Sequence, residues 1–426
     1  MFKRYRSISL IIRILIGIVI GTTLALIVPQ WSFISILGDL FVGALKAIAP
    51  LMVFFIIMSA LAQYETGSKN HFSTVIVLYM AATFIAALTA VAVSYIFPVS
   101  IVFPKGTHVT NAIPKGLGPI IQNLLTNAVS NPLKAITDAN YLAILFWSLL
   151  FGVTIRKTGP TIRHSVQEIA NTISSVAQFI IEFAPFGIVG LVFNAVSQTG
   201  LAGVVRYGQL VVLLVGTMAF VYLVVYAGMA WIMTGQNPYP LIFWTLKVSG
   251  IPAFFTRSSA VNIPINMQAS ADLGLDESSY GVSIPLGGSA NSGGAAVTIT
   301  VMTLAATHTL GISVSFPLAF ILCLLTAISA TGASGIAGGS LLLIPMAASL
   351  FGISNDIAIQ VVGVGFIIGV IQDAVETAVN SASDLPFTAV AEYHDEKKAG
   401  RPVAIAAAVK AATARRHLPP AQMRSP

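Results

Sequence analysis

The chain has 426 residues, of which 56% are hydrophobic and only 9% are charged, with a formal net charge of +7 and a mean hydropathy of +0.87. This balance excludes a soluble globular protein, and apolar runs of about 20 residues, each long enough to cross a bilayer, indicate a polytopic membrane protein. Residues 391–426 hold seven Lys/Arg against three Asp/Glu, a net of +4. That excess fits a cytoplasmic tail beside anionic lipid better than binding of nucleic acid.

The first part of the chain reads as a series of membrane spans. We predict an uncleaved first span at about 8–29, with its start in the cytoplasm. Further predicted spans lie at about 38–62, 74–100, 139–155, 168–198 and 209–234. The basic residues of the loop after residue 155 and of the tail place both termini in the cytoplasm. The Pro/Gly/Asn-rich connection at 101–138, with three lysines, fits this rule less well and is predicted to be a surface loop.

After residue 240, two polar interruptions occur at depths where an unbroken helix would be expected. The first runs from Phe255 to Ser259, and the second from Ser329 to Ser340. Non-helical backbone at membrane depth needs protein or water as its partner, so both predict re-entrant hairpins. A span with a central Asn follows each of them, which suggests inverted repeats. The alternative is that small residues merely let helices pack closely. The predicted fold is all-α, with about eight transmembrane helices and two re-entrant hairpins.

The last apolar span, GFIIGVIQDAVETAVNSASD, carries several polar residues on one helical face. They are Asp373, Glu376, Thr377, Asn380 and Asp384, spaced three or four residues apart. One ionisable residue at the bilayer centre costs about 2.5 to 3.5 kcal/mol, so three carboxylates must face protein, water or a cation. This pattern predicts a site for an ion or a substrate.

The segment SIPLGGSANSGGAAVTIT contains a Gly-rich break around Asn291. Such a break frees backbone carbonyls and adds an amide oxygen, the hard ligands that a small cation prefers. Asp384 and the Asn380 carbonyl are predicted to complete the site. Sodium is the predicted ion, with protons as the alternative.

Four blocks in this order resemble the dicarboxylate/amino acid:cation symporter family. They are AFFTRSSAVNIPINM, SIPLGGSAN, ATGASGIAGGSLLLIP and IIGVIQDAVETAVNSASDLPFTA. The resemblance implies a homotrimer in the lipid bilayer and an elevator mechanism. It also implies mainly scaffold helices, with some transport-domain helices, in 1–235, a core transport domain in 236–390 and a basic cytoplasmic tail in 391–426.

The resemblance also implies roles for individual residues. Asp373 would hold the substrate's amino group, Asn380 would lie near its carboxylate, and the backbone of Ser258 and Ser259 would donate to that carboxylate. The implied substrate-binding residues are Arg257, Ser258, Ser259, Ala295, Ile336, Asp373, Glu376, Thr377 and Asn380. The implied sodium ligands are Gly287, Ser289, Asn291, Ala330, Thr331, Ala333, Asn380 and Asp384.

One departure from the family pattern concerns the substrate. Where dicarboxylate carriers place an Arg, this chain has Glu376. A buried Glu repels an acidic side chain, whereas it accepts a hydrogen bond from a hydroxyl, so serine and threonine fit better. Arg257 would neutralise Glu376 or Asp373, form a purely structural ion pair, or grip an acidic substrate.

A second departure concerns the cation. The family's Asn-Met-Asp-Gly-Thr signature appears here as Asn291-Ser292-Gly293-Gly294-Ala295. A sodium site that uses the missing carboxylate is predicted to be absent, so fewer ions would be coupled to each substrate.

We therefore predict a sodium-coupled symporter, without enzymatic activity, that imports serine and threonine across the cytoplasmic inner membrane. The alternative within the family is a sodium- or proton-coupled dicarboxylate or glutamate carrier. Two alternatives of other classes are an ion channel and an intramembrane protease with paired carboxylates.

Overall fold

The computed structural model describes residues 10–63, 72–101, 126, 128–331, 338–401 and 404–416, and within these ranges every regular element is a helix. The α-helices are α2 (Leu10–Ile27), α3 (Ile36–Ala62), α4 (Phe72–Ile96), α6 (Pro132–Thr137), α7 (Tyr141–Ile155), α8 (Pro160–Ile181), α9 (Ala184–Thr199), α10 (Leu201–Phe220), α11 (Ala227–Thr234), α12 (Tyr239–Thr245), α13 (Ile251–Thr256), α14 (Ser259–Leu273), α15 (Glu277–Ala290), α16 (Gly293–Thr309), α17 (Phe316–Ala330), α18 (Ile344–Ser349), α19 (Asn355–Lys398) and α20 (Ile405–Arg416). Tighter or wider turns form the 3-10 segments η1 (Ser32–Ser35) and η4 (Gly339–Leu343) and the π-helical segments η2 (Val221–Tyr226) and η3 (Leu246–Gly250). The predicted all-helical class is confirmed.

Several helices have the length and composition of membrane spans. Within the described ranges, the four that meet both criteria cover Ser32–Ala62, Thr74–Ile96, Tyr207–Thr234 and Asn355–Lys398. Shorter apolar helices cover Ile12–Ile27, Tyr141–Ile155, Phe316–Ala330 and Gly339–Ser349. These helices fit a polytopic membrane protein, while the total of about eight spans stays a prediction.

The predicted span at 168–198 consists of two helices with a sharp bend between them. Helix α8 ends at Ile181, and α9 begins at Ala184 after a bend of 53°. Pro185 lies in the first turn of α9, where a residue without a backbone N–H is tolerated, but in the interior of a helix it would break the hydrogen-bond ladder. Most of the connection at 101–138 lies outside the described residues.

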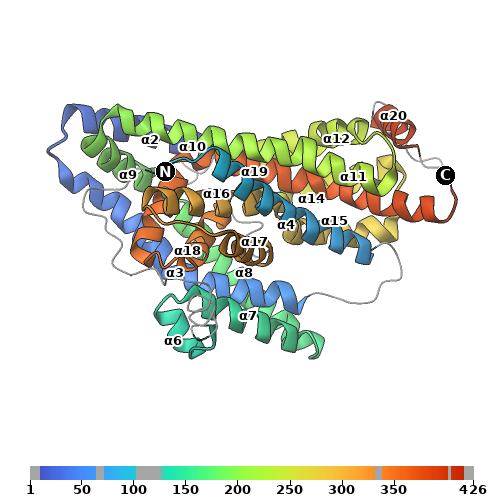
Figure 1. Ribbon diagram of the computed structural model, residues 1–426, viewed down its shortest axis with the longest axis horizontal. Coiled ribbons are helices and arrows are strands. Elements are labelled where there is room, and N and C mark those ends of the chain that lie inside the picture. Colours follow the sequence, from blue (N-terminus) through green and yellow to red (C-terminus); the bar gives the residue numbers. More distant parts are fainter. Residues whose placement is uncertain are drawn as a thin grey trace, which may run out of the picture.

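Helices α2, α3, α7, α8 and α9 form a first group that packs mainly on itself (Figure 1). Its contacts depend on small residues. A Cβ atom on Gly190 of α9 would lie 2.3 Å from the backbone nitrogen of Gly38 on α3, and one on Gly17 of α2 would lie 2.5 Å from the Pro185 carbonyl oxygen. In lipid, where apolar surface has little drive to associate, such close approach is what holds helices together.

Helix α19 is the centre of the second group. It contains 44 residues and runs along the length of the molecule beside α10, with α4, α14 and α16 also packed against it (Figure 1). At 1.5 Å per residue it is about 66 Å long, so its ends extend beyond a hydrocarbon core of about 30 Å. It continues past residue 391, where the tail was expected to begin, to Lys398.

The second group also contains the predicted breaks. Arg257 and Ser258 interrupt the helix between α13 and α14, and Asn291 and Ser292 interrupt it between α15 and α16. The middle of the second predicted hairpin, residues 332–337, lies outside the described residues. Its flanks are α17 on one side and η4 with α18 on the other.

Candidate functional site

The first break places Arg257 next to α19. Arg257 ends α13 in the left-handed conformation, with a φ of 51°, and Ser258 begins α14 by accepting a hydrogen bond from the Val261 nitrogen at 3.3 Å. This abrupt change of direction points the guanidinium at Asp373, where both Nε and Nη2 lie 2.6 Å from Oδ2. The predicted contact between Arg257 and one of the two carboxylates is therefore present, and its partner is Asp373.

Asp373 also contacts the segment that begins at Gly338. Its second oxygen, Oδ1, accepts a hydrogen bond at 2.9 Å from the backbone nitrogen of Gly338, which precedes η4. The Arg257 and Asp373 side chains are 9% and 4% exposed, so this ion pair is largely removed from solvent. One carboxylate thus contacts both the turn between α13 and α14 and the start of η4.

Glu376, one turn further along α19, is surrounded by donors. Its Oε2 atom accepts hydrogen bonds from three side chains on three parts of the fold: Thr298 Oγ1 at 2.7 Å, Ser340 Oγ at 2.7 Å and Gln372 Nε2 at 2.5 Å. Among the described residues, all hydrogen bonds to this carboxylate end on Oε2. Glu376 is 6% exposed, so hydroxyl and amide groups take the place of water around its carboxyl group.

The break between α15 and α16 faces the next two turns of α19. The Asn380 Oδ1 atom accepts from the Gly294 nitrogen at 2.7 Å, at the start of α16. The Asn291 amide nitrogen donates to three oxygens, namely the Asn380 carbonyl at 3.2 Å, Ser383 Oγ at 2.7 Å and Asp384 Oδ1 at 2.9 Å. The structure therefore brings Asn291, Asn380 and Asp384 together as predicted.

Gly287 lies against the same carboxylate. A Cβ atom there would lie 2.5 Å from Asp384 Oδ1, so a side chain at this position would displace the carboxylate. Asp384 is 1% exposed and Asn291 is 1% exposed. The Asn291 Oδ1 atom is buried and accepts no hydrogen bond from the described residues. A buried oxygen without a donor beside a buried carboxylate fits a small hard cation.

The sequence did not reveal every partner of Asp384. Asn266 of α14 donates to Asp384 Oδ2 at 3.5 Å and to the Ser381 carbonyl at 2.9 Å. Asn262, one turn earlier, donates to Ser381 Oγ at 2.7 Å. Two asparagines four residues apart in one helix were the available signal, since they share one face.

The remaining predicted residues are less closely connected to this cluster. Ser259 and Ala295 are buried, and the Thr377 hydroxyl donates to the Asp373 carbonyl at 2.8 Å. At the end of α17, Ala330 is buried, and the Thr331 hydroxyl donates to the Ile328 carbonyl at 2.7 Å. Ala333, Ile336 and the side chain of Ser289 lie outside the described residues.

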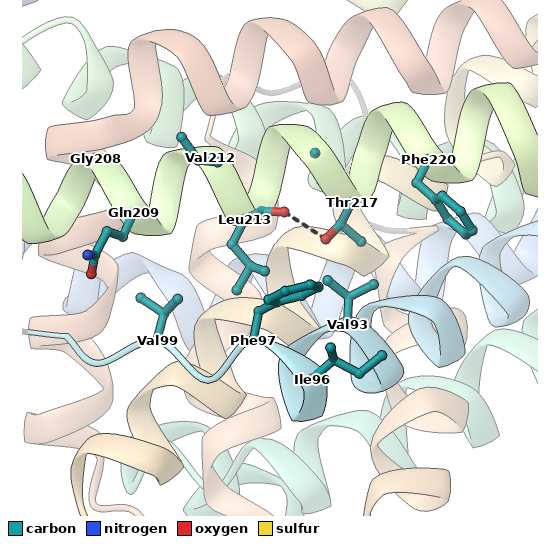
Figure 2. A pocket seen from close by; sticks show the side chains of 11 residues that line it. Val93, Ile96, Phe97, Val99, Gly208, Gln209, Val212, Leu213, Thr217 and Phe220 are labelled. Carbon is teal, nitrogen blue, oxygen red and sulfur yellow. Dashed lines mark hydrogen bonds between the residues drawn. The ribbon is translucent and has the colours of Figure 1, made fainter.

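An apolar cavity of about 830 Å³ lies elsewhere, between the end of α4 and α10 (Figure 2). The lining side chains are apolar except for Thr217 and Gln209. The Thr217 hydroxyl donates to the Leu213 carbonyl at 2.6 Å. A zwitterionic amino acid needs polar or charged partners at both ends, so this apolar cavity does not suit one.

Buried charged and amide groups at two helix breaks are typical of membrane transporters with discontinuous helices. Residues 10–393 match the sodium:dicarboxylate symporter family, and the chain belongs to this family.

Three relatives are similar over nearly the whole chain. The chain is 65% identical to the serine/threonine transporter SstT of Lacticaseibacillus paracasei over 412 residues, which cover 97% of this chain and 95% of the relative. It is 55% identical to the SstT protein of Enterococcus faecalis, over 96% of this chain and 97% of the relative. It is also 55% identical to that of Streptococcus agalactiae, over 92% and 97%.

Proposed function

We propose that this protein is a sodium-coupled symporter that carries serine and threonine through the bilayer. The observation that carries the proposal is the environment of Glu376, a buried carboxylate with three hydrogen bonds on Oε2. The relatives, which are named serine/threonine transporters, support the same substrates.

Glu376 is the proposed determinant of the substrate side chain. Its Oε1 atom is the oxygen that would accept a hydrogen bond from the substrate hydroxyl. An aspartate or glutamate side chain would instead bring a second negative charge to the same place, which is strongly unfavourable in a buried site. A site that depends on a hydroxyl also discriminates against alanine, because the acceptor is then left unpaired.

The two ends of the substrate backbone have separate proposed partners. The amino group would bind Asp373, which already holds the Arg257 guanidinium and so lies in a site suited to a cation. The carboxylate would bind the Asn380 amide nitrogen and backbone N–H groups at the start of α14, where the helix dipole favours an anion. This arrangement orients the substrate side chain toward Glu376.

The cation is proposed to bind between Asn291, Asn380 and Asp384. Rotation of the Asn291 amide by 180° would turn Oδ1, in place of the nitrogen, toward the three oxygens that the nitrogen now contacts. Sodium would then have carbonyl, hydroxyl, amide and carboxylate ligands, with one charge balanced by Asp384. The carbonyls around Ala330 and Thr331 remain a proposed second sodium site.

The larger-scale mechanism is also proposed from the family. The helix group of α2, α3, α7, α8 and α9 would be the scaffold, and the group around α19 would move across the membrane with its substrate. A homotrimer, cytoplasmic termini and location in the inner membrane complete this proposal.

Two observations weigh against the alternatives. Asp373 and Asp384 belong to separate hydrogen-bond clusters and lie eleven residues apart on α19, which is about 16 Å at 1.5 Å per residue, too far for a protease dyad. Arg257 pairs with Asp373, which makes it less available to grip an acidic substrate.

The direct test is uptake of labelled serine into proteoliposomes with and without an inward sodium gradient. Threonine should compete strongly, alanine weakly, and aspartate and glutamate very little. Sodium-independent uptake, or competition by aspartate but not by threonine, would overturn the proposal.

A further inference from the structure

The side-chain position of residue 293 is already occupied. Gly293 begins α16 directly after the break, and a Cβ atom on it would lie 1.8 Å from Tyr226 Oη and 3.1 Å from Tyr226 Cζ. A Cβ atom cannot lie 1.8 Å from an oxygen atom to which it is not bonded. The Tyr226 hydroxyl therefore stands where the first atom of a residue-293 side chain would be.

Tyr226 is held firmly in this position. It is 1% exposed, and its ring packs against Phe387 with centroids 5.0 Å apart and against Tyr222 at 6.2 Å. It is also the last residue of η2, the π-helical turn between α10 and α11. Such turns re-aim side chains within long helices and occur often at functional sites.

The Tyr226 hydroxyl is not stabilised by a hydrogen bond to any described residue. Tyr226 Oη is buried and has no hydrogen-bond partner among the described residues. The two nearby tyrosines differ, because Tyr222 Oη pairs with Thr245 Oγ1 at 2.7 Å and Tyr79 Oη donates to the Ser283 carbonyl at 3.2 Å. An unpaired buried hydroxyl costs stability that phenylalanine would not. A hydroxyl kept at this cost indicates a role at the break.

We propose that Tyr226 limits the number of cations bound at the break by excluding any side chain from position 293. The inference rests on the proposed sodium coupling. A cation beside a buried carboxylate favours its charged form, and Asn291, two residues before position 293, donates to Asp384. A carboxylate at position 293 would therefore favour a second cation at the break. A neutral hydroxyl fixed at this position keeps the cluster to the single charge of Asp384.

Exclusion is tested with alanine. Gly293→Ala should reduce sodium-driven serine uptake at least about tenfold, because the new methyl overlaps the hydroxyl. Tyr226→Phe should keep uptake near that of the unsubstituted protein. The double variant Tyr226→Phe/Gly293→Ala should recover most of the lost uptake. Full activity of Gly293→Ala alone, or no recovery in the double variant, would overturn the inference.

The cation number is tested with a charge. Tyr226→Phe/Gly293→Asp should raise the ratio of labelled sodium to labelled serine transported by about one ion, while the uncharged Tyr226→Phe/Gly293→Asn leaves the ratio unchanged. Detergent size-exclusion chromatography reports folding of each variant. An unchanged ratio in the Asp variant, or an Asp variant that fails to fold while the Asn variant folds, would contradict the inference.

Failure of this inference is distinguishable from failure of the proposed function. If the unsubstituted protein transports serine without sodium, the proposed function itself fails. If the unsubstituted protein is sodium-coupled, the results for the variants concern the role of Tyr226 alone.

Discussion

The two helix groups of this protein are held together in different ways. Where α3 meets α9, Gly38 and Gly190 let the backbones touch, and the surroundings are apolar. Where α14 and α16 meet α19, the contacts are hydrogen bonds between buried amides, hydroxyls and carboxylates such as Asn266, Asn291 and Asp384. The first interface depends on shape, so it fails when volume is added. The second depends on charge, so it fails when a charge is removed.

The strongest test of the charged region is Asp384→Asn, which keeps the volume and removes the charge. Sodium-driven serine uptake should fall about 100-fold or more, because loss of one buried charged partner is worth several kcal/mol. Asp276→Asn, at the exposed start of α15, is the matched control, since asparagine caps a helix as well as aspartate does. Uptake within a few-fold of the control would mean that Asp384 does not balance the cation.

The corresponding test of the apolar interface is Gly190→Ala. The added methyl would lie 2.3 Å from the Gly38 nitrogen, so the helices must separate at a cost of about 1–3 kcal/mol or more. Thermal unfolding followed by size-exclusion chromatography should show a lower midpoint. Gly43→Ala on α3 is the control, because nothing lies within 4 Å of its Cβ position. Equal midpoints for the two variants would contradict this description of the interface.

The smallest expected effect is at the edge of the second helix group, where α20 packs against α14. Arg416 Nε lies 2.6 Å from Asp272 Oδ2, and its guanidinium lies 5.4 Å from the Trp244 ring. Arg416→Gln should lower stability by less than about 1 kcal/mol, since partly exposed ion pairs are weak. The exposed Lys410→Gln on the same helix should change nothing. A loss as large as that of Gly190→Ala would show that α20 contributes more than this contact.

The sequence predicted what local spacing determines. The polar face of α19 followed from residue types at helical intervals, and the break at Asn291 followed from the glycines around it. The contact of Arg257 with a carboxylate was one of the alternatives that its charge allowed. The donors to Glu376 did not, because Thr298 and Ser340 reach it only through packing of distant helices.

The most direct measurement of the central claim compares serine with alanine as competitors of labelled serine uptake, in the unsubstituted protein and in Glu376→Gln. The unsubstituted protein should prefer serine at least about tenfold, because its carboxylate accepts the substrate hydroxyl. In Glu376→Gln this preference should fall several-fold toward one, since a neutral amide accepts more weakly than a carboxylate. An unchanged preference in a folded, active variant would contradict the role assigned to Glu376.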